Sequence, residues 1–292
     1  MALTFFKMQG CGNDYVYVDG FRWEIEDGPE LARSLANRSF GVGSDGLIIV
    51  APPRAGGQLR MVMFNADGSR SEMCGNGVRC LAKLGYDLGY VSAPSFIVET
   101  DGGPRRVELC FSAGGVVTGA RVDMGLPRWL CAEVPMDGEG AAVERCVEVA
   151  GGSFRGTGVS MGNPHFVVFV DAPPEDALVL GMGPRLERHA SFPERANIEF
   201  VEVLTRGHLR MRVWERGSGE TLACGTGASA ALVAGVLTDR CARKVRCELP
   251  GGELELEWPA ADAALSMTGP ATLVFTAELA ELPVSCRLRR DP

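Results

Sequence analysis

The chain carries the same short motif twice. Met61–Gly77 aligns with Met211–Gly227, so that Cys74 in one copy corresponds to Cys224 in the other, 150 residues further on. The two segments share a first methionine, an aromatic residue three positions later, and a terminal Cys-Gly-x-Gly sequence. Identity is low, so any single match could arise by chance. Several matches on one diagonal, including the rare Cys-Gly-x-Gly, favour a duplicated domain.

The length of the chain agrees with a duplication. At 292 residues it exceeds what one hydrophobic core usually supports, so we expect two domains. We assign residues 1–125 to an N-terminal half that contributes Cys74, and residues 126–270 to a C-terminal half that contributes Cys224. The remaining segment, about 271–292, is expected to pack back on the N-terminal half as a strand.

Both halves show the same order of expected elements, and that order indicates an α+β fold with much antiparallel strand. In each half a Gly-Asn turn precedes an alternating strand, two further strands follow, and a loop rich in glycine leads to the cysteine and then to a helix. The predicted strands cover residues 14–19, 46–51, 59–64, 166–171, 197–204, 209–214 and 252–258. The predicted helices cover residues 29–37, 78–87 and 228–238, the first without a counterpart in the second half.

The composition excludes several classes of protein. With 46% hydrophobic residues the chain is too apolar to be disordered, and no apolar run approaches the roughly 18 residues that span a membrane. A net charge of −8 argues against a nucleic-acid partner. The first residues do not read as a leader peptide, so we expect a cytoplasmic protein with no membrane partner.

The ten cysteines are expected to be reduced in that compartment. None forms a C-x2-C pair and the chain has three histidines, so we expect no metal site. A free cysteine is usually a small buried hydrophobe, and we assign this role to eight of the ten. Cys74 and Cys224 are the exceptions, because they occupy matched positions in the repeat.

Each of these two thiols is predicted to lie just before a helix. The positive end of the helix dipole and the unpaired N–H groups of the first turn favour a thiolate there, and cysteine pKa values at such positions fall to about 3.5–7.5. The neighbouring glycines let a ligand approach the backbone, whose N–H groups can hold a carboxylate. Each half therefore offers a reactive thiol beside an anion site.

Two such thiols suit the inversion of a stereocentre next to a carboxylate. One thiolate removes the α-proton from one face of the carbon, and one thiol returns a proton to the other face. Two helix N-termini would stabilise the charge that develops on the carboxylate. We therefore expect an epimerase or racemase that requires no cofactor.

At this point the chain resembles a known family, the diaminopimelate epimerases. The resemblance covers about residues 5–270 and rests on several segments: Gly12-Asn-Asp14, Phe64-Asn-Ala-Asp-Gly-Ser69, Met73-Cys-Gly-Asn-Gly-Val-Arg79, Met161-Gly-Asn-Pro-His165, Phe192-Pro-Glu-Arg-Ala-Asn197 and Trp214-Glu-Arg-Gly-Ser-Gly-Glu-Thr-Leu-Ala-Cys-Gly-Thr-Gly227. It implies two pseudo-symmetric domains, each a mostly antiparallel sheet around a central helix, with the active site in the cleft between them. It also implies a homodimer.

The resemblance further implies the activity. Members of the family interconvert LL- and meso-diaminopimelate without pyridoxal phosphate, on the route to lysine and peptidoglycan. Cys74 and Cys224 would be the acid/base pair. The implied carboxylate-binding residues are Gly75, Asn76, Gly225 and Thr226; those implied for the amino and distal groups are Asn13, Asn65, Asn163, Asn197, Glu215 and Arg216. His165 and Glu215 would tune the thiol pKa values.

The chemistry of these residue types agrees with that assignment. An arginine such as Arg216 is a natural partner for a distal carboxylate, and Glu215 and the asparagine carbonyls can accept hydrogen bonds from ammonium groups. Simpler interpretations remain open for individual residues, since Asn13 and Asn163 could be turn residues and the Arg-Gly pair an ordinary loop.

The chain departs from the family pattern at two positions. Gly46 stands where some relatives have glutamine, which removes a side-chain contact, and Cys11 replaces a small or apolar residue near Asn13. We expect a structural role for Cys11. The Gly41–Gly46 stretch matches a dinucleotide-binding fingerprint, but it precedes a strand instead of opening a helix, so we reject nicotinamide binding.

Two other functions compete with the epimerase. A racemase of the same fold could act on a single-headed amino acid such as proline or glutamate. A thiol-redox module could cycle Cys74 and Cys224 through a disulfide. A non-catalytic binding protein would not need two thiols at matched positions.

Overall fold

The computed structural model describes residues 2–281 and 284–289. The chain divides into two compact units, the first formed by residues 1–122 with 269–292 and the second by residues 123–268. Across the described ranges, no helix is both long enough and apolar enough to cross a membrane.

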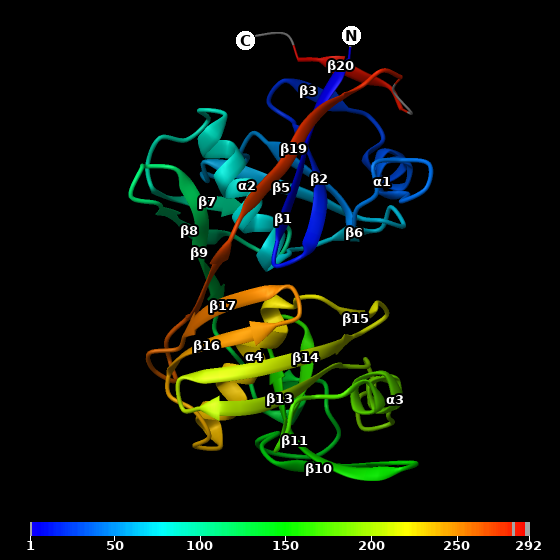
Figure 1. Ribbon diagram of the computed structural model, residues 1–292, viewed down its shortest axis with the longest axis vertical. Coiled ribbons are helices and arrows are strands. Elements are labelled where there is room, and N and C mark those ends of the chain that lie inside the picture. Colours follow the sequence, from blue (N-terminus) through cyan, green and yellow to red (C-terminus); the bar gives the residue numbers. More distant parts are fainter. Residues whose placement is uncertain (1, 282–283, 290–292) are drawn as a thin grey trace. The chain divides into compact units, whose positions relative to one another are not determined.

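Unit 1 is built on one curved sheet (Figure 1). Its strands pair in the spatial order β19, β1, β2, β4, β5, β7, β8 and β9, and only β2–β4 and β5–β7 are parallel pairs. The bounds are β1 Leu3–Gly10, β2 Asn13–Asp19, β3 Trp23–Ile25, β4 Gly46–Ala51, β5 Leu59–Asn65, β6 Arg70–Ser71, β7 Ser95–Glu99, β8 Arg105–Phe111, β9 Val117–Gly125, β19 Thr272–Leu279 and β20 Cys286–Leu288. β20 pairs with β3 in a separate small sheet.

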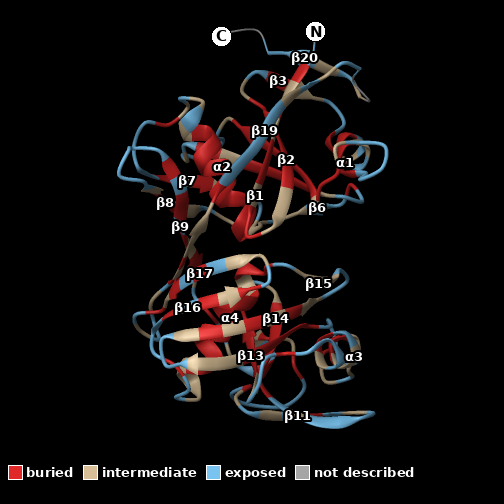
Figure 2. Cartoon of the chain, in the orientation of Figure 1, coloured by how far each residue is buried: buried red, intermediate tan, exposed pale blue. Residues whose placement is uncertain are grey.

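Helix α2 (Gly75–Asp87) lies inside the curve of this sheet and packs on β1, β2, β4, β5 and β8. It is buried along most of its length (Figure 2). Helix α1 (Gly28–Ala36) covers the opposite face of the sheet, packing on β2, β4 and β5. Because both faces of β4 are covered, all six of its residues are buried, which explains its uninterrupted apolar sequence.

Unit 2 repeats the same arrangement. Its strands pair in the order β10, β11, β12, β13, β14, β16, β17 and β18. The parallel pairs are β12–β13 and β14–β16, which occupy the same positions in this order as β2–β4 and β5–β7 do in unit 1. The bounds are β10 Arg145–Val149, β11 Gly152–Ser160, β12 Pro164–Val170, β13 Asn197–Thr205, β14 His208–Glu215, β15 Gly219–Thr221, β16 Lys244–Leu249, β17 Gly252–Glu257 and β18 Leu265–Pro270. A short 3-10 turn, Cys131–Glu133, precedes them.

Helix α4 (Gly225–Leu237) is the counterpart of α2 and packs on β11, β12, β13, β16 and β17. The predicted α+β class, with a mostly antiparallel sheet around a central helix in each half, is therefore confirmed. The predicted starts of the two central helices were wrong by three residues. They begin at Gly75 and Gly225, not at 78 and 228, because the glycines after each cysteine already adopt helical conformation.

Helix α3 (Asp176–Glu187) is the counterpart of α1 and was not predicted from the sequence. Its segment contains Gly181, Gly183 and an internal Pro184, which are residues that weaken a helix in isolation. Tertiary packing compensates, because Val179 and Leu186 are fully buried in a core cluster with Phe166 and Phe200. Packing on β13 and β14 therefore stabilises a helix that its own sequence disfavours.

The two glycines of α3 allow a direct test of this packing. A Cβ on Gly183 would lie 2.7 Å from the Cβ of Trp214 on β14, whereas a Cβ on Gly181 would meet no atom within 4 Å. We expect Gly183→Ala to lower the free energy of unfolding by about 1–3 kcal/mol through overpacking. The control Gly181→Ala should raise it by about 0.5–1 kcal/mol through helix propensity. Urea unfolding followed by circular dichroism measures both, and equal effects would contradict this docking of α3.

Candidate active site

Each repeated cysteine is the N-cap of the central helix of its unit. Cys74 has extended backbone angles of φ −132° and ψ 121°, and its Sγ accepts a hydrogen bond from Gly77 N at 3.3 Å. Cys224, at φ −118° and ψ 110°, accepts in the same way from Gly227 N at 3.4 Å. The sulfur atoms thus occupy the place that a Ser or Asp oxygen usually takes at a helix start.

The second glycine of each Cys-Gly-x-Gly is required by close packing. A Cβ on Gly77 would lie 2.7 Å from Ile48 Cδ1, and a Cβ on Gly227 would lie 2.7 Å from Glu199 Oε1 and 3.3 Å from Cys224 Sγ. The strands β4 and β13 therefore press against the first turns of α2 and α4. The absence of side chains there keeps each sulfur close to its helix.

In unit 1 the Cys74 thiol donates a hydrogen bond to Asn13 Oδ1 at 3.2 Å. Asn13 Nδ2 in turn donates to Asp45 Oδ2 at 2.7 Å, which fixes the orientation of the amide. Asp45 also accepts from Arg38 at 3.0 Å. Sequence reasoning missed Asp45, because it lies in the Gly41–Gly46 stretch that matched only a dinucleotide fingerprint.

The other unit 1 candidates are engaged mainly with the protein. Asn65 Nδ2 donates to Ser69 Oγ at 3.0 Å across the β5–β6 hairpin. Asn76 is buried, and its Oδ1 accepts from the buried Arg79 at 2.8 Å. Gly75 and Asn76 form the first turn of α2, where backbone N–H groups have no acceptor within the helix. The backbone of this pair, more than the side chain of Asn76, is therefore the part suited to a carboxylate.

The structure also accounts for the two departures from the family pattern. A Cβ on Gly46 would lie 2.1 Å from Phe64 O, so no side chain fits on this backbone. Cys11 is buried at the tight turn between β1 and β2 with φ 53°. Burial raises the pKa of its thiol, an effect that the nearby Arg79 guanidinium partly offsets. A buried protonated thiol agrees with a structural role for Cys11.

In unit 2 a hydrogen-bonded series leads from the protein interior to the start of α4. His165 is fully buried, with Nδ1 2.7 Å from Glu199 Oε1 and Nε2 3.0 Å from Asn163 Oδ1. Asn163 Nδ2 then donates to Thr226 Oγ1 at 3.5 Å. Thr226 Oγ1 lies 3.4 Å from Cys224 Sγ. Four sequence candidates, Asn163, His165, Cys224 and Thr226, therefore come together here, along with Glu199, which the sequence reasoning did not single out.

The surroundings of Cys224 overturn the expectation of a low thiol pKa at that position. Burial raises the pKa of Cys224 well above its usual value, and the carboxylates of Glu215 and Glu199 raise it further. The hydrogen bonds from Thr226 and Gly227 oppose this shift but do not cancel it. The helix N-terminus is thus outweighed by desolvation and two acidic neighbours, which together favour the protonated form of Cys224.

Glu215 is itself held beside this thiol. It ends β14, and its Oε1 accepts a short hydrogen bond from Thr221 Oγ1. Burial raises the pKa of Glu215, while hydrogen bonds from Thr221 and Cys224 lower it in part. The carboxyl group is therefore positioned to exchange a hydrogen bond with Cys224.

Arg216 follows Glu215 at an exposed turn. Its guanidinium donates to Glu194 O at 2.9 Å, and its backbone N donates to Asn197 Oδ1 at 2.9 Å. Asn197 is buried and also donates from Nδ2 to Pro164 O at 2.9 Å. In this structure Asn197 joins the turn that carries Arg216 to the β12–β13 pair, so it supports the position of that arginine.

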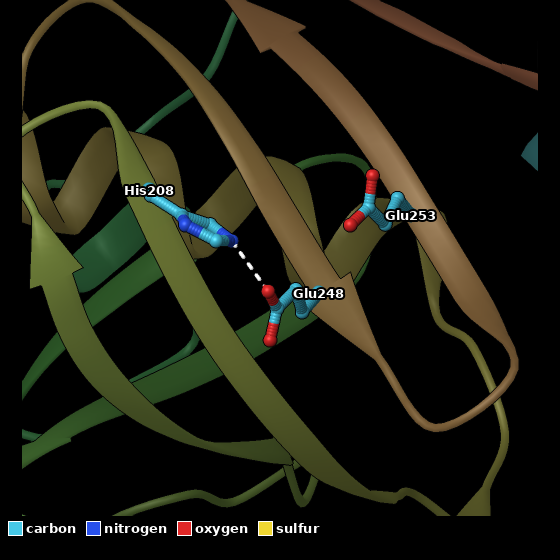
Figure 3. A group of neighbouring side chains, drawn as sticks. All are labelled: His208, Glu248 and Glu253. Carbon is cyan, nitrogen blue, oxygen red and sulfur yellow. Dashed lines mark ion pairs between the residues drawn. The ribbon is translucent and has the colours of Figure 1, made fainter.

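A separate group of side chains, His208, Glu248 and Glu253, lies on neighbouring strands of unit 2 (Figure 3). All three offer ligand atoms within 4.8 Å of one another. The group is also an ion-pair ladder, since His208 Nε2 lies 2.7 Å from Glu248 Oε1 and Arg210 Nε lies 3.1 Å from Glu248 Oε2. Arg210 pairs with Glu248 and Arg246 pairs with Glu253, so arginine side chains already neutralise both carboxylates.

The comparisons with known proteins agree with this geometry. The family model described as diaminopimelate epimerase matches residues 5–130 and 157–274. These ranges contain both cysteines and every other candidate site residue named above. The chain belongs to the diaminopimelate epimerase family. It is accordingly an isomerase.

Individual relatives support the family assignment over nearly the whole chain. The diaminopimelate epimerase of Desulfovibrio desulfuricans is 50% identical over 285 residues, which covers 95% of this chain and 98% of the relative. That of Moorella thermoacetica is 50% identical over 275 residues, covering 94% and 98%.

Solved structures show the fold at much lower identity. A probable proline racemase from Agrobacterium radiobacter superposes with a TM-score of 0.68 at 15% identity, covering 96% of this chain and 94% of the other. A PhzF-family phenazine biosynthesis protein from Bacillus anthracis gives a TM-score of 0.67 at 15% identity, covering 96% and 100%. The fold is thus shared with proteins outside the diaminopimelate epimerase family.

The raised pKa of Cys224 leads to a test by alkylation. Replacing the Glu215 carboxylate with an amide removes one of the negative charges that raise this pKa, so Glu215→Gln should lower it and increase the thiolate fraction. We expect Cys224 to react faster with iodoacetamide at pH 7.5 in the variant, measured by peptide mass spectrometry. The exposed Cys146 of the same unit is the internal control. An unchanged or slower reaction at Cys224 would contradict the role of Glu215.

Proposed function

We propose that this chain interconverts LL- and meso-diaminopimelate by two-base proton transfer at one α-carbon. The observation that carries the proposal is the matched placement of Cys74 and Cys224, each at the N-cap of the central helix in one of two equivalent units. Membership of the diaminopimelate epimerase family supports the choice of substrate. The reaction serves lysine and peptidoglycan-precursor synthesis.

In the proposed reaction the two thiols act on opposite faces of the substrate α-carbon. One cysteine, as thiolate, takes the α-proton, and the electron pair of the C–H bond passes to the carbon and its carboxylate. The other cysteine, as thiol, gives its proton to the opposite face. The two sulfur atoms have then exchanged protonation states, so the reverse reaction uses them in reversed roles. The proposed chemistry uses no cofactor.

The reacting carboxylate would be bound by the two helix N-termini. The first turns of α2, at Gly75 and Asn76, and of α4, at Gly225 and Thr226, present backbone N–H groups beside the sulfur atoms. Such N–H groups and the helix dipole stabilise negative charge. The charge on the carboxylate grows as the α-proton leaves, so these groups contribute most in the transition state.

The raised pKa of Cys224 suits the proton donor in one direction of the reaction. Glu215 beside it can accept a hydrogen bond from the thiol or from the substrate ammonium group. We propose that Asn13, Asn163 and Asn65 contact the reacting amino acid and the distal group. The exposed guanidinium of Arg216 would bind the distal carboxylate, and Asn197 would support it.

The decisive experiment follows solvent deuterium into the substrate. In deuterated water the wild-type protein should label the α-carbon of LL-diaminopimelate as it inverts, whereas Cys74→Ala and Cys224→Ala should each lose about 10²–10⁴-fold in inversion rate, because one face then lacks its acid or base. Cys146→Ala, at an exposed position, is the matched control and should retain full activity.

The same assay separates the competing functions. Turnover of proline or glutamate without turnover of diaminopimelate would refute the substrate assignment. Full inversion by either alanine variant of Cys74 or Cys224 would refute the two-thiol mechanism.

We also propose that the chain is a cytoplasmic homodimer. Free thiols in the reaction require a reducing compartment. Strand β19 of unit 1 exposes neighbouring apolar side chains, with Leu273, Val274 and Phe275 exposed to 41, 55 and 43%. Exposed apolar strands of this kind are usually covered by a partner in stable proteins, and a second copy of the chain is the partner we propose.

A charge placed on β19 tests this assembly. We expect the wild type to sediment at twice the chain mass of 31.1 kDa, and Phe275→Lys to sediment as the single chain, because a buried lysine without a partner opposes association. Arg287→Lys, on a separate exposed strand, is the control. A dimeric Phe275→Lys variant would contradict β19 as the interface.

A further inference from the structure

Helix α3 of unit 2 ends in a buried carboxyl group. Glu187 is the last residue of the helix and is 2% exposed. A negative charge at the C-terminal end of a helix opposes the helix dipole, and burial removes the hydration of a carboxylate. Helix stability and burial therefore both disfavour a glutamate at this position, so the hydrogen bonds that it makes must compensate.

Both oxygens of Glu187 accept hydrogen bonds from the end of β14 and the turn that follows it. Oε2 accepts from Trp214 Nε1 at 3.1 Å, and Oε1 accepts from the backbone N of Gly217 at 3.1 Å. Gly183 lies one turn earlier on the same face of α3 and leaves room for the Trp214 side chain, because a Cβ there would lie 2.7 Å from Trp214 Cβ. This packing brings the carboxyl group to the edge of the indole ring, beside the turn.

The same carboxyl group also contacts the segment that precedes Asn197. Its Oε1 lies 3.7 Å from the guanidinium of Arg195, whose backbone is in the left-handed region at φ 57°. In that segment the carbonyl oxygen of Glu194 accepts from the Arg216 guanidinium at 2.9 Å. Arg216 directly precedes Gly217. Glu187 is therefore bonded to both segments between which the Arg216 side chain is held.

Unit 1 differs from unit 2 at these positions. By the offset of 150 that relates the two cysteines, Glu187 corresponds to Asn37 and Arg216 corresponds to Ala66. Asn37 follows α1, and its Oδ1 accepts from the backbone N–H groups two and three residues further on, within its own loop. The carboxyl group thus occurs in the unit whose turn carries an arginine, and the corresponding turn of the other unit carries an alanine.

We propose that Glu187 is a positioning residue for the distal end of the substrate. It joins the Glu215–Gly217 turn to the segment 193–196 and so holds the Arg216 guanidinium in place for a carboxylate. This inference rests on the proposed function, in which Arg216 binds the distal carboxylate of diaminopimelate. A guanidinium that is held before the substrate arrives loses less side-chain freedom on binding, so the contact is stronger.

The donors that Glu187 binds make glutamine an informative replacement. The indole N–H of Trp214 and the backbone N–H of Gly217 can only donate, so each requires an acceptor oxygen. A glutamine has one such oxygen, and its NH2 group would face the other donor. Glu187→Gln therefore keeps the size of the side chain but releases one of the two contacts.

We expect Glu187→Gln to raise KM for LL-diaminopimelate by about fivefold or more, with kcat nearly unchanged. The distal carboxylate is bound in the same way in the ground state and in the transition state, and loss of such uniform binding appears in KM. The deuterium-labelling assay gives both constants. Circular dichroism and thermal unfolding show whether the variant is folded.

Glu175→Gln is the matched control. Glu175 lies at the other end of the same helix, as the N-cap of α3, where it is exposed and its side chain makes no capping hydrogen bond. The charge change is the same as in Glu187→Gln, so a general electrostatic effect on the doubly charged substrate end would appear in both. We expect KM and kcat of Glu175→Gln to equal those of the wild type.

A double-mutant cycle with Arg216→Gln separates positioning from a merely structural role. If Glu187 acts through Arg216, adding Glu187→Gln to Arg216→Gln should raise KM by less than about twofold further. A general loosening of unit 2 would instead multiply the two single effects. Multiplicative effects would overturn the proposal.

Trp214→Phe is a second variant that keeps the carboxyl group. It removes the N–H that holds Oε2, and Phe64 occupies the equivalent position in unit 1. We expect KM to rise in the same direction as in Glu187→Gln, by about twofold or more, with kcat nearly unchanged. If Glu187→Gln does not fold, an unchanged KM in Trp214→Phe would overturn the proposal.

Amide hydrogen exchange at Gly217, followed by NMR, needs no substrate. The Gly217 N–H is bonded to Glu187 Oε1, so it should exchange at least about tenfold faster in Glu187→Gln than in the wild type or Glu175→Gln. A wild-type protein that does not epimerise diaminopimelate would refute the proposed function, and the exchange comparison would still show whether Glu187 holds the turn. Equal exchange rates in the wild type and Glu187→Gln, or an unchanged KM in an active Glu187→Gln protein, would overturn the role of Glu187.

Discussion

The contact between a cysteine sulfur and the first turn of a buried helix is the constraint on which the site depends. In each unit Sγ accepts from the N–H three residues ahead, at 3.3 Å for Cys74 and 3.4 Å for Cys224. This contact needs a helix that starts immediately after the cysteine and a glycine where a strand presses against that turn. The curved sheet, the Gly-rich loop and the Cys-Gly-x-Gly motif all serve this geometry. The carboxylate site follows from it, because the same turn presents its N–H groups to a ligand.

The two units share this arrangement but differ in the side chains that surround the cysteine. Near Cys74 lie Ile48 and Asn13, and Asp45 orients the Asn13 amide. Near Cys224 lie Glu199 and Asn163, and His165 contacts the Asn163 amide. A two-base reaction uses one thiol and one thiolate at the same time, and the two sulfur atoms exchange these forms during the reaction. Burial and the carboxylates of Glu215 and Glu199 raise the pKa of Cys224.

Much of the fold could be predicted from patterns in the sequence. The buried strand Gly46–Ala51 has the predicted bounds, since covering both of its faces produces an uninterrupted apolar run. The two central helices, α2 and α4, were predicted from the sequence, although their glycine-rich first turns were assigned to the preceding loops. Helix α3 was not found, because Gly181, Gly183 and Pro184 disfavour it locally and only contact with β13 and β14 stabilises it.

The sequence by itself determined the duplication, the paired thiols and the type of chemistry, because those depend on residue identity at matched positions. Only the tertiary structure brought Asp45 and Glu199 into the surroundings of these thiols. Both residues lie outside the repeated motif that contains the cysteines. The shift of the Cys224 pKa likewise follows from burial and from two carboxylates brought in by neighbouring strands. Electrostatic effects depend on distance and desolvation, which a linear sequence does not contain.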